Sequence, residues 1–145
     1  MRFQIVKRFY SNIQANIYYL KLKEYGVNCL IENVPNPTPY LLVSVDDFLL
    51  FEEEMDPPMD IVFDVAHAHL QEESIQFIEQ FGHKIKHVHV SDNFGDTDQH
   101  LPLGEGNINW RRVIDTLSNA DYHGWLVIES YNKMSQSIDY LKNLI

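Results

Sequence analysis

Four short apolar segments, separated by segments of helical character, constrain the fold of this chain more than any other feature. The apolar segments span 27–34, 59–67, 84–92 and 125–130, and the helical ones span 4–24, 46–55, 72–81, 108–120 and 133–144. Regular alternation of this kind predicts parallel strands joined by right-handed crossovers. The three prolines of segment 35–40 predict a loop there. Because no linker or low-complexity tract interrupts the pattern, we expect one domain over residues 1–145.

Two architectures fit the alternation: an open doubly wound sheet, or part of a closed (β/α) barrel. The glycine-rich fingerprints G-x-G-x-x-G and G-x-x-x-x-G-K-[ST] follow none of the four predicted strands. The nucleotide-binding forms of the doubly wound sheet therefore lose their main support. A TIM barrel needs eight strand–helix units, so the pattern is that of half a barrel.

Composition restricts the possible partners and location. The chain has 21 acidic against 11 basic residues, a net charge of −10, which disfavours broad binding to a nucleic-acid backbone without excluding a local site. No apolar run reaches the ~18 residues of a membrane span. The first residues do not resemble a secretory signal, and a single cysteine, Cys29, cannot form an internal disulfide. We therefore expect a cytoplasmic protein without a membrane partner.

Each predicted strand ends in an ionisable residue; in chain order these are Glu32, Asp64, His89 and Glu129. The carboxyl ends of parallel strands meet at one edge of the sheet, where barrel enzymes place their active sites. Buried carboxylates are costly unless positive charge neutralises them, and few Lys or Arg residues lie nearby in the sequence. The four residues therefore predict a divalent-cation site, although any single strand-end acid could instead cap the following helix.

A second group of potential ligands follows the same strands. The spacing Asp64-x-x-His67 places a histidine beyond the turn after its strand, and Asp98-x-His100 points two ligands to one side of an extended loop. Carboxylate and imidazole ligands suit zinc or manganese, and a more oxygen-rich site would tolerate magnesium. Gly104 and Gly106, just after this pair, permit close approach of the backbone to a ligand.

Five motifs together resemble the xylose isomerase-like TIM barrel superfamily, which contains sugar isomerases and epimerases as well as endonuclease IV-like AP endonucleases. In chain order the motifs are Ile31-Glu32-Asn33, Phe63-Asp64-Val65-Ala66-His67, His87-Val88-His89-Val90-Ser91-Asp92, Asp98 to Gly106, and Val127-Ile128-Glu129. The resemblance covers nearly the whole chain. It implies that the chain is the C-terminal half of the barrel, strands five to eight with their helices, whereas full-size members carry four further units before it.

The resemblance also implies roles for these residues. In the isomerase and epimerase branch, positions matching Glu32, Asp64, His89 and Glu129 hold one divalent ion (Mn, Zn, Mg or Co), and the position of His67 contacts substrate. In the endonuclease branch, positions matching His67, Asp98 and His100 hold an additional zinc. That branch draws two further histidine ligands from the other half of the barrel, which this sequence lacks.

Three functions remain open at this stage. We expect first an enzyme that isomerises or epimerises a sugar or sugar phosphate through a metal-stabilised enediolate, with Glu32 and Glu129 as general base and acid. The alternatives are a truncated or remnant half-barrel that binds metal without catalysis, and a zinc-dependent AP endonuclease. Since a half-barrel has open edges, we expect a homodimer or a complementary N-terminal half-barrel as partner, and do not expect nucleic acid.

Overall fold

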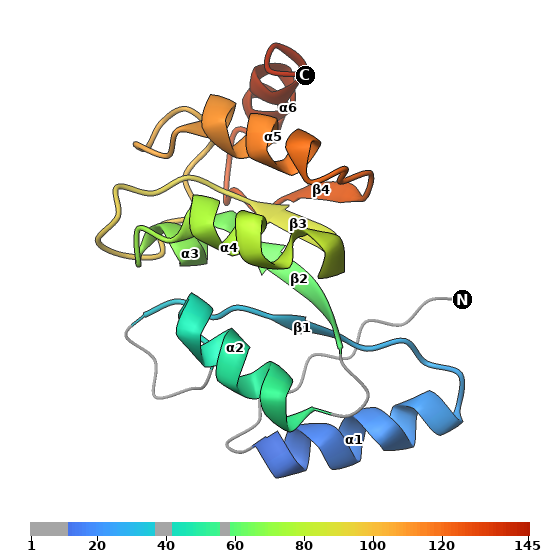
Figure 1. Cartoon of the computed structure of the whole chain (residues 1–145). Coiled ribbons are helices and arrows are strands. Elements are labelled where there is room, and N and C mark those ends of the chain that lie inside the picture. The colour runs from blue at the N-terminus through green and yellow to red at the C-terminus, as the bar shows by residue number, and fades with distance from the viewer. Residues whose placement is uncertain (1–11, 37–41, 56–58) are drawn as a thin grey trace.

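The computed structural model describes residues 12–36, 42–55 and 59–145. It contains a parallel sheet of four strands in the order β1-β2-β3-β4, formed by Leu30–Glu32, Asp60–Asp64, Ile85–Val90 and Trp125–Ile128. Neighbours in the sheet are therefore neighbours in the chain, with helices between them (Figure 1). This arrangement confirms the predicted parallel α/β fold and has the form of half a barrel.

Helices connect the strands and flank the sheet. They are α1 (Asn12–Glu24), α2 (Val45–Glu54), α3 (Val65–His69), α4 (Ser74–Phe81), α5 (Trp110–Asn119) and α6 (Met134–Lys142), with a 3₁₀ turn at Gly82–Lys84. The part of the predicted helix 4–24 before residue 12, and most of the predicted loop 35–40, lie outside the described residues. The other predicted elements are found with shifted ends.

All four strands are shorter than predicted, and the second one shows why. Segment 59–67 is a strand only as far as Asp64, and the chain then turns directly into α3. Asp64 causes this change, because its side chain accepts a hydrogen bond from the backbone N–H of His67 at 2.9 Å and so caps the helix. The helix therefore begins directly after the last residue of the strand, and His67 lies beside Asp64.

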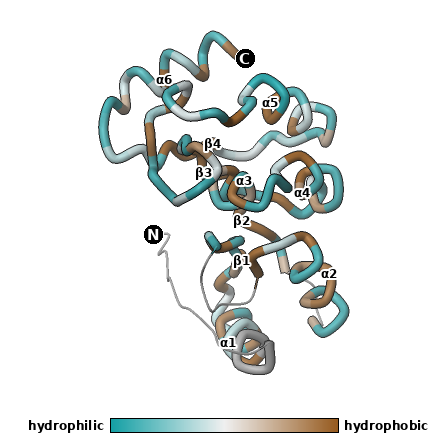
Figure 2. Tube along the Cα trace, turned by 90° about the vertical axis from the view of Figure 1, so that its left-hand side faces the viewer, coloured by the Kyte–Doolittle hydropathy of each residue, from teal (hydrophilic) through white to brown (hydrophobic). Residues whose placement is uncertain are grey.

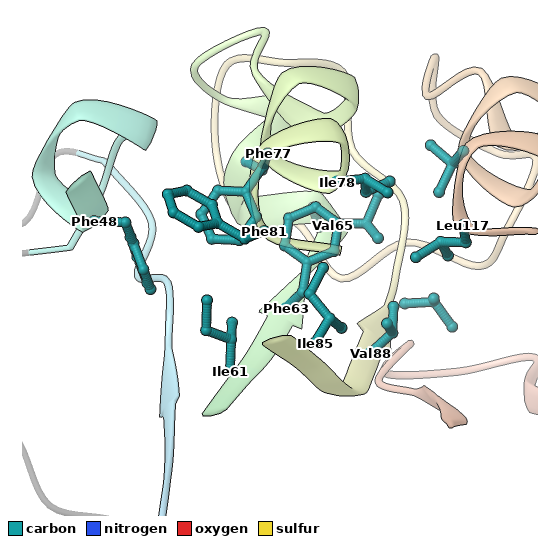
Figure 3. Close-up of a cluster of buried hydrophobic side chains, with 14 of the residues drawn as sticks. Phe48, Ile61, Phe63, Val65, Phe77, Ile78, Phe81, Ile85, Val88 and Leu117 are labelled. Carbon is teal, nitrogen blue, oxygen red and sulfur yellow. The ribbon is translucent and has the colours of Figure 1, made fainter. Parts of the chain in front are cut away.

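The core fills the space between one face of the sheet and helices α2, α4 and α5 (Figure 3). Phe63 of β2 stacks on Phe77 of α4, with ring centroids 4.7 Å apart. Phe48 of α2 meets Phe77 edge-on at 4.9 Å, and both rings are almost fully buried. Hydropathy follows this layering, with apolar positions along the strands and polar ones along the outer loops (Figure 2). Packing against the helices on this face therefore stabilises the sheet.

The opposite face of the sheet carries the ionisable residues. Side chains alternate between the faces of a strand, so Asp64 and His89 point away from the helix-packed neighbours Phe63 and Val88. Register pairs Asp64 with His89 and His89 with Val127, which brings the strand ends together. On this face Trp125 is 74% exposed. Among the described residues, no helix is long and apolar enough to cross a membrane.

Candidate metal centre

Glu32, Asp64 and His89, at the carboxyl ends of three adjacent strands, form the first group of ligands. One ligand atom from each lies within 4.8 Å of the other two. The His89 Nδ1 atom is 2.9 Å from Glu32 Oε1 and 4.0 Å from Asp64 Oδ2. Three of the four residues that the sequence pattern singled out, Glu32, Asp64 and His89, thus have mutually close ligand atoms.

Glu129 joins this group through His89. It follows β4, and its Oε1 atom lies 3.3 Å from His89 Nδ1. The tight group of mutually close ligand atoms contains Glu32, Asp64 and His89 without Glu129. The two glutamates thus approach His89 from the first and last strands of the sheet, and their side chains are 36% and 32% exposed whereas that of His89 is 7% exposed.

Asp64 is fully buried and is held by Asn33. The Asn33 side chain donates to the backbone oxygen of Asp64 at 2.8 Å and accepts from its N–H at 2.7 Å. Burial raises the pKa of the Asp64 carboxyl to about 6, although the nearby histidines oppose this shift. Among the described residues Asp64 Oδ2 has no hydrogen-bond partner. A buried, unpartnered carboxylate oxygen beside an imidazole nitrogen is chemically suited to a divalent cation.

His67, Asp98 and His100 form a second group beside the first. Asp98 Oδ2 lies 3.4 Å from His67 Nε2 and 3.2 Å from His100 Nε2, so Asp98 stands between the two histidines. The other ring nitrogens are fixed by backbone carbonyl oxygens, His67 Nδ1 by Asn33 at 2.8 Å and His100 Nδ1 by Glu129 at 2.9 Å. This pattern holds each Nε2 toward Asp98 and is typical of imidazoles that bind metal.

His67 lies between the two groups, with Nε2 also 3.8 Å from Asp64 Oδ2. Burial lowers the pKa of His67, but its hydrogen bond to Asp98 and the charge of Asp64 outweigh burial and raise that pKa to about 9. Burial likewise lowers the pKa of His89, and Glu32, Glu129 and Asp64 reverse the effect and raise it. A cation in either group would replace these protons as the positive charge that the carboxylates require.

Three residues near the site were given no role from the sequence, although two of them, Asn33 and Asp92, lie within the quoted motifs. Asn33 clamps Asp64, Asp92 organises the loop that carries Asp98, and the ring of Tyr131 stacks on His100 with centroids 4.6 Å apart. A polar residue within two positions of the end of a buried strand is the signal that could have marked Asn33 and Asp92. For Tyr131 the sequence holds no comparable signal, since its contact with His100 depends on how two loops meet.

The fold has the form of half a (β/α) barrel with two groups of potential metal ligands, and comparison with known proteins identifies the family. A profile of the xylose isomerase-like TIM barrel family matches residues 6–144, and the chain belongs to this family. The crystal structure of a D-tagatose 3-epimerase-like protein superposes with a TM-score of 0.84 at 30% identity, covering 92% of this chain and 52% of that one.

The curated proteins similar to this chain include sugar epimerases. An uncharacterized protein of Methanocaldococcus jannaschii, MJ1311, is 35% identical over 114 residues, or 76% of this chain and 39% of the relative. Fructoselysine 3-epimerase of Escherichia coli O157:H7 is 25% identical over 115 residues, or 75% of this chain and 42% of the relative. The chain thus spans less than half the length of these relatives.

Proposed function

We propose that this chain provides the metal-binding half of a divalent-metal-dependent sugar or sugar-phosphate isomerase or epimerase. The observation that carries the proposal is the proximity of Glu32, Asp64 and His89, with Glu129 Oε1 3.3 Å from the same imidazole nitrogen. Relatives whose names describe epimerases of fructoselysine and D-psicose support a ketose as the substrate class. A cytoplasmic location remains part of this proposal.

We assign two roles to these residues, holding the cation and moving protons, and the glutamates take part in both. Asp64 and His89, whose side chains are 1% and 7% exposed, would hold the cation together with the glutamates. When bound, Mn, Zn, Mg or Co would act as a Lewis acid that stabilises negative charge on substrate oxygens. Glu32 and Glu129 are accessible and approach from opposite strands, so one would remove the proton from the substrate carbon and the other would return a proton. His67 would orient a substrate oxygen.

Proton exchange at carbon tests these roles directly. Incubated with Mn²⁺ in D₂O, the protein should introduce deuterium next to the carbonyl of D-psicose or D-fructose, detected by NMR. Glu129→Gln keeps the shape of the side chain but removes the base, so exchange should fall by about 10²- to 10⁴-fold. Glu79→Gln, the same change on the exposed side of α4, is the matched control. Equal exchange by Glu129→Gln and the parent protein would contradict the assignment.

The second ligand group favours a second candidate, zinc-dependent hydrolysis of a phosphodiester at an abasic site. Asp98 between two oriented histidines offers a position for an additional zinc. The net charge of −10 opposes approach of DNA, which places this candidate behind the first. Nicking of an abasic duplex by the zinc-loaded protein, without deuterium exchange into ketoses, would reverse this order. Metal binding with neither activity would identify a non-catalytic remnant.

We further propose that four more strands complete the barrel around this site, supplied by a second copy of the chain or by a complementary N-terminal half-barrel. Within the described residues, β1 pairs only with β2, and β4 pairs only with β3. Both outer strands thus offer a free edge, and unpaired edges favour pairing with another chain or segment. The remainder of the substrate pocket would come from this second half.

A further inference from the structure

The loop between β3 and α5, residues 91–109, supplies Asp98 and His100 and is held without a helix or extended strand of its own. One antiparallel bridge joins Asp92 to Leu101, with both backbone hydrogen bonds at 2.9 Å. His100 has a left-handed backbone with φ of 48°, which is unfavourable for a residue with a side chain. Such a conformation persists only where the surroundings determine it, so something must organise this loop.

The side chain of Asp92 lies at the centre of this loop. It is fully buried, and its carboxylate accepts four hydrogen bonds. Oδ2 accepts from the N–H of Gly104 at 2.8 Å and from the indole N–H of Trp110 at 2.9 Å. Oδ1 accepts from the N–H groups of Asn93 at 3.0 Å and Ile108 at 3.3 Å. One side chain therefore joins the end of β3, two points of the loop and the first residue of α5.

The packing around this carboxylate leaves no room for a side chain at position 106. A Cβ atom at Gly106 would lie 2.3 Å from Asp92 Oδ1 and 2.3 Å from the backbone oxygen of Asn93. Trp110 is 1% exposed, so its indole ties the carboxylate to the hydrophobic core. Since Leu101, bonded to the Asp92 backbone, directly follows His100, the position of Asp92 determines where His100 begins its turn.

We propose that Asp92 is a positioning residue that holds Asp98 and His100 in place to complete the second ligand group with His67. It acts through the loop rather than by touching a metal or substrate. The effect on metal binding rests on the second metal position named under the proposed function, whereas the effect on the loop does not. The two parts are therefore tested by separate measurements.

Amide hydrogen exchange on the full chain without metal tests the effect on the loop. Asp92→Asn replaces one accepting oxygen by an NH₂ group that faces N–H donors. At least one of the amides of Gly104 and Ile108, the one that loses its acceptor, should therefore exchange at least about 10-fold faster. Protection of Phe63 and Val88 in the core strands should be unchanged. Asp96→Asn, the same substitution at an exposed position of this loop, is the matched control.

Two results would overturn the proposal: unchanged exchange at Gly104 and Ile108, or an equal loss of protection in the core strands. If Asp92→Asn does not fold, Trp110→Phe replaces it, because it removes only one of the two donors to Oδ2. That variant should accelerate exchange at Gly104 in the same direction by a smaller factor. Unchanged exchange at Gly104 in a folded Trp110→Phe variant would then contradict the role of Asp92.

Zinc titration tests the consequence for the second ligand group. Asp92→Asn should weaken the second of two zinc equivalents by about 10- to 100-fold, the usual effect of losing support behind a ligand. In an Asp98→Asn background the same substitution should have no further effect on the remaining zinc. A similar loss in both backgrounds would contradict positioning through Asp98. A parent protein that binds one zinc would refute the second metal position, while the exchange experiment would still decide the role of Asp92 in the loop.

Discussion

At the scale of single residues, the carboxylates of the site favour positive charge on the neighbouring histidines, and His67 shows this effect most clearly. Its imidazole is bonded to Asp98 and lies near Asp64, which together raise its pKa to about 9. In the unfolded chain a histidine titrates near 6.5. A raised pKa means that the folded protein holds this proton more tightly, so its stabilising effect is complete below about pH 6.5 and is lost as pH rises through 9.

We therefore predict that the melting temperature of the chelator-treated protein falls between pH 6.5 and 9. The pKa of Asp64 changes in the same sense but at lower pH, since burial raises it to about 6. His67→Gln should flatten the decrease, whereas His123→Gln, at a side chain 83% exposed, should leave it intact. Added Zn²⁺ should raise the melting temperature more at pH 8 than at pH 6, because metal binding must displace these protons. A pH-independent melting temperature in the parent protein would contradict this prediction.

At the scale of secondary-structure elements, the sheet keeps its ligands in place because α4 packs against its other face. Phe77 is 1% exposed and contacts the rings of Phe48, Phe63 and Phe81. Phe77→Ala should lower the free energy of unfolding by about 3–5 kcal/mol, measured by urea denaturation. Leu50→Ala, at a position of α2 that is 62% exposed, should change it by less than about 0.5 kcal/mol. A similar loss of unfolding free energy in both variants would contradict the central role of Phe77 in the core.

The same elements show what the sequence alone could predict. Alternation along β2 and β3 assigns Asp64 and His89 to one face, because period-two patterning depends only on local geometry. The short helix after Asp64 was missed, since five residues are too few to show a helical period. The family resemblance implied that His67, Asp98 and His100 act together, but periodicity alone could predict neither the link between Asp98 and His67 nor the contacts of Asp92. They depend on the path of a long loop, which no periodicity encodes.

At the scale of the whole molecule, the sheet has the layout of half a barrel, with one face covered by helices and the other open as far as the described residues extend. Trp125 is 74% exposed on the open face, at the outermost strand β4. A buried tryptophan removes roughly 150–250 Å² from water, so covering this residue would contribute to barrel closure. Two identical chains would also bring two charges of −10 together, which opposes pairing at low ionic strength.

We predict that closure by a second copy gives a particle of twice 17.0 kDa by light scattering, and that its dissociation constant falls as salt screens the repulsion. Trp125→Lys should shift the particle to a single chain, because it places a charge on the face that pairing would cover. Leu50→Lys, on the exposed side of α2, should leave the mass unchanged. A stable particle of 17.0 kDa at every salt concentration would contradict pairing of identical chains. Closure would then require a complementary half-barrel. Adding such a partner should reduce the quenching of Trp125 fluorescence by iodide.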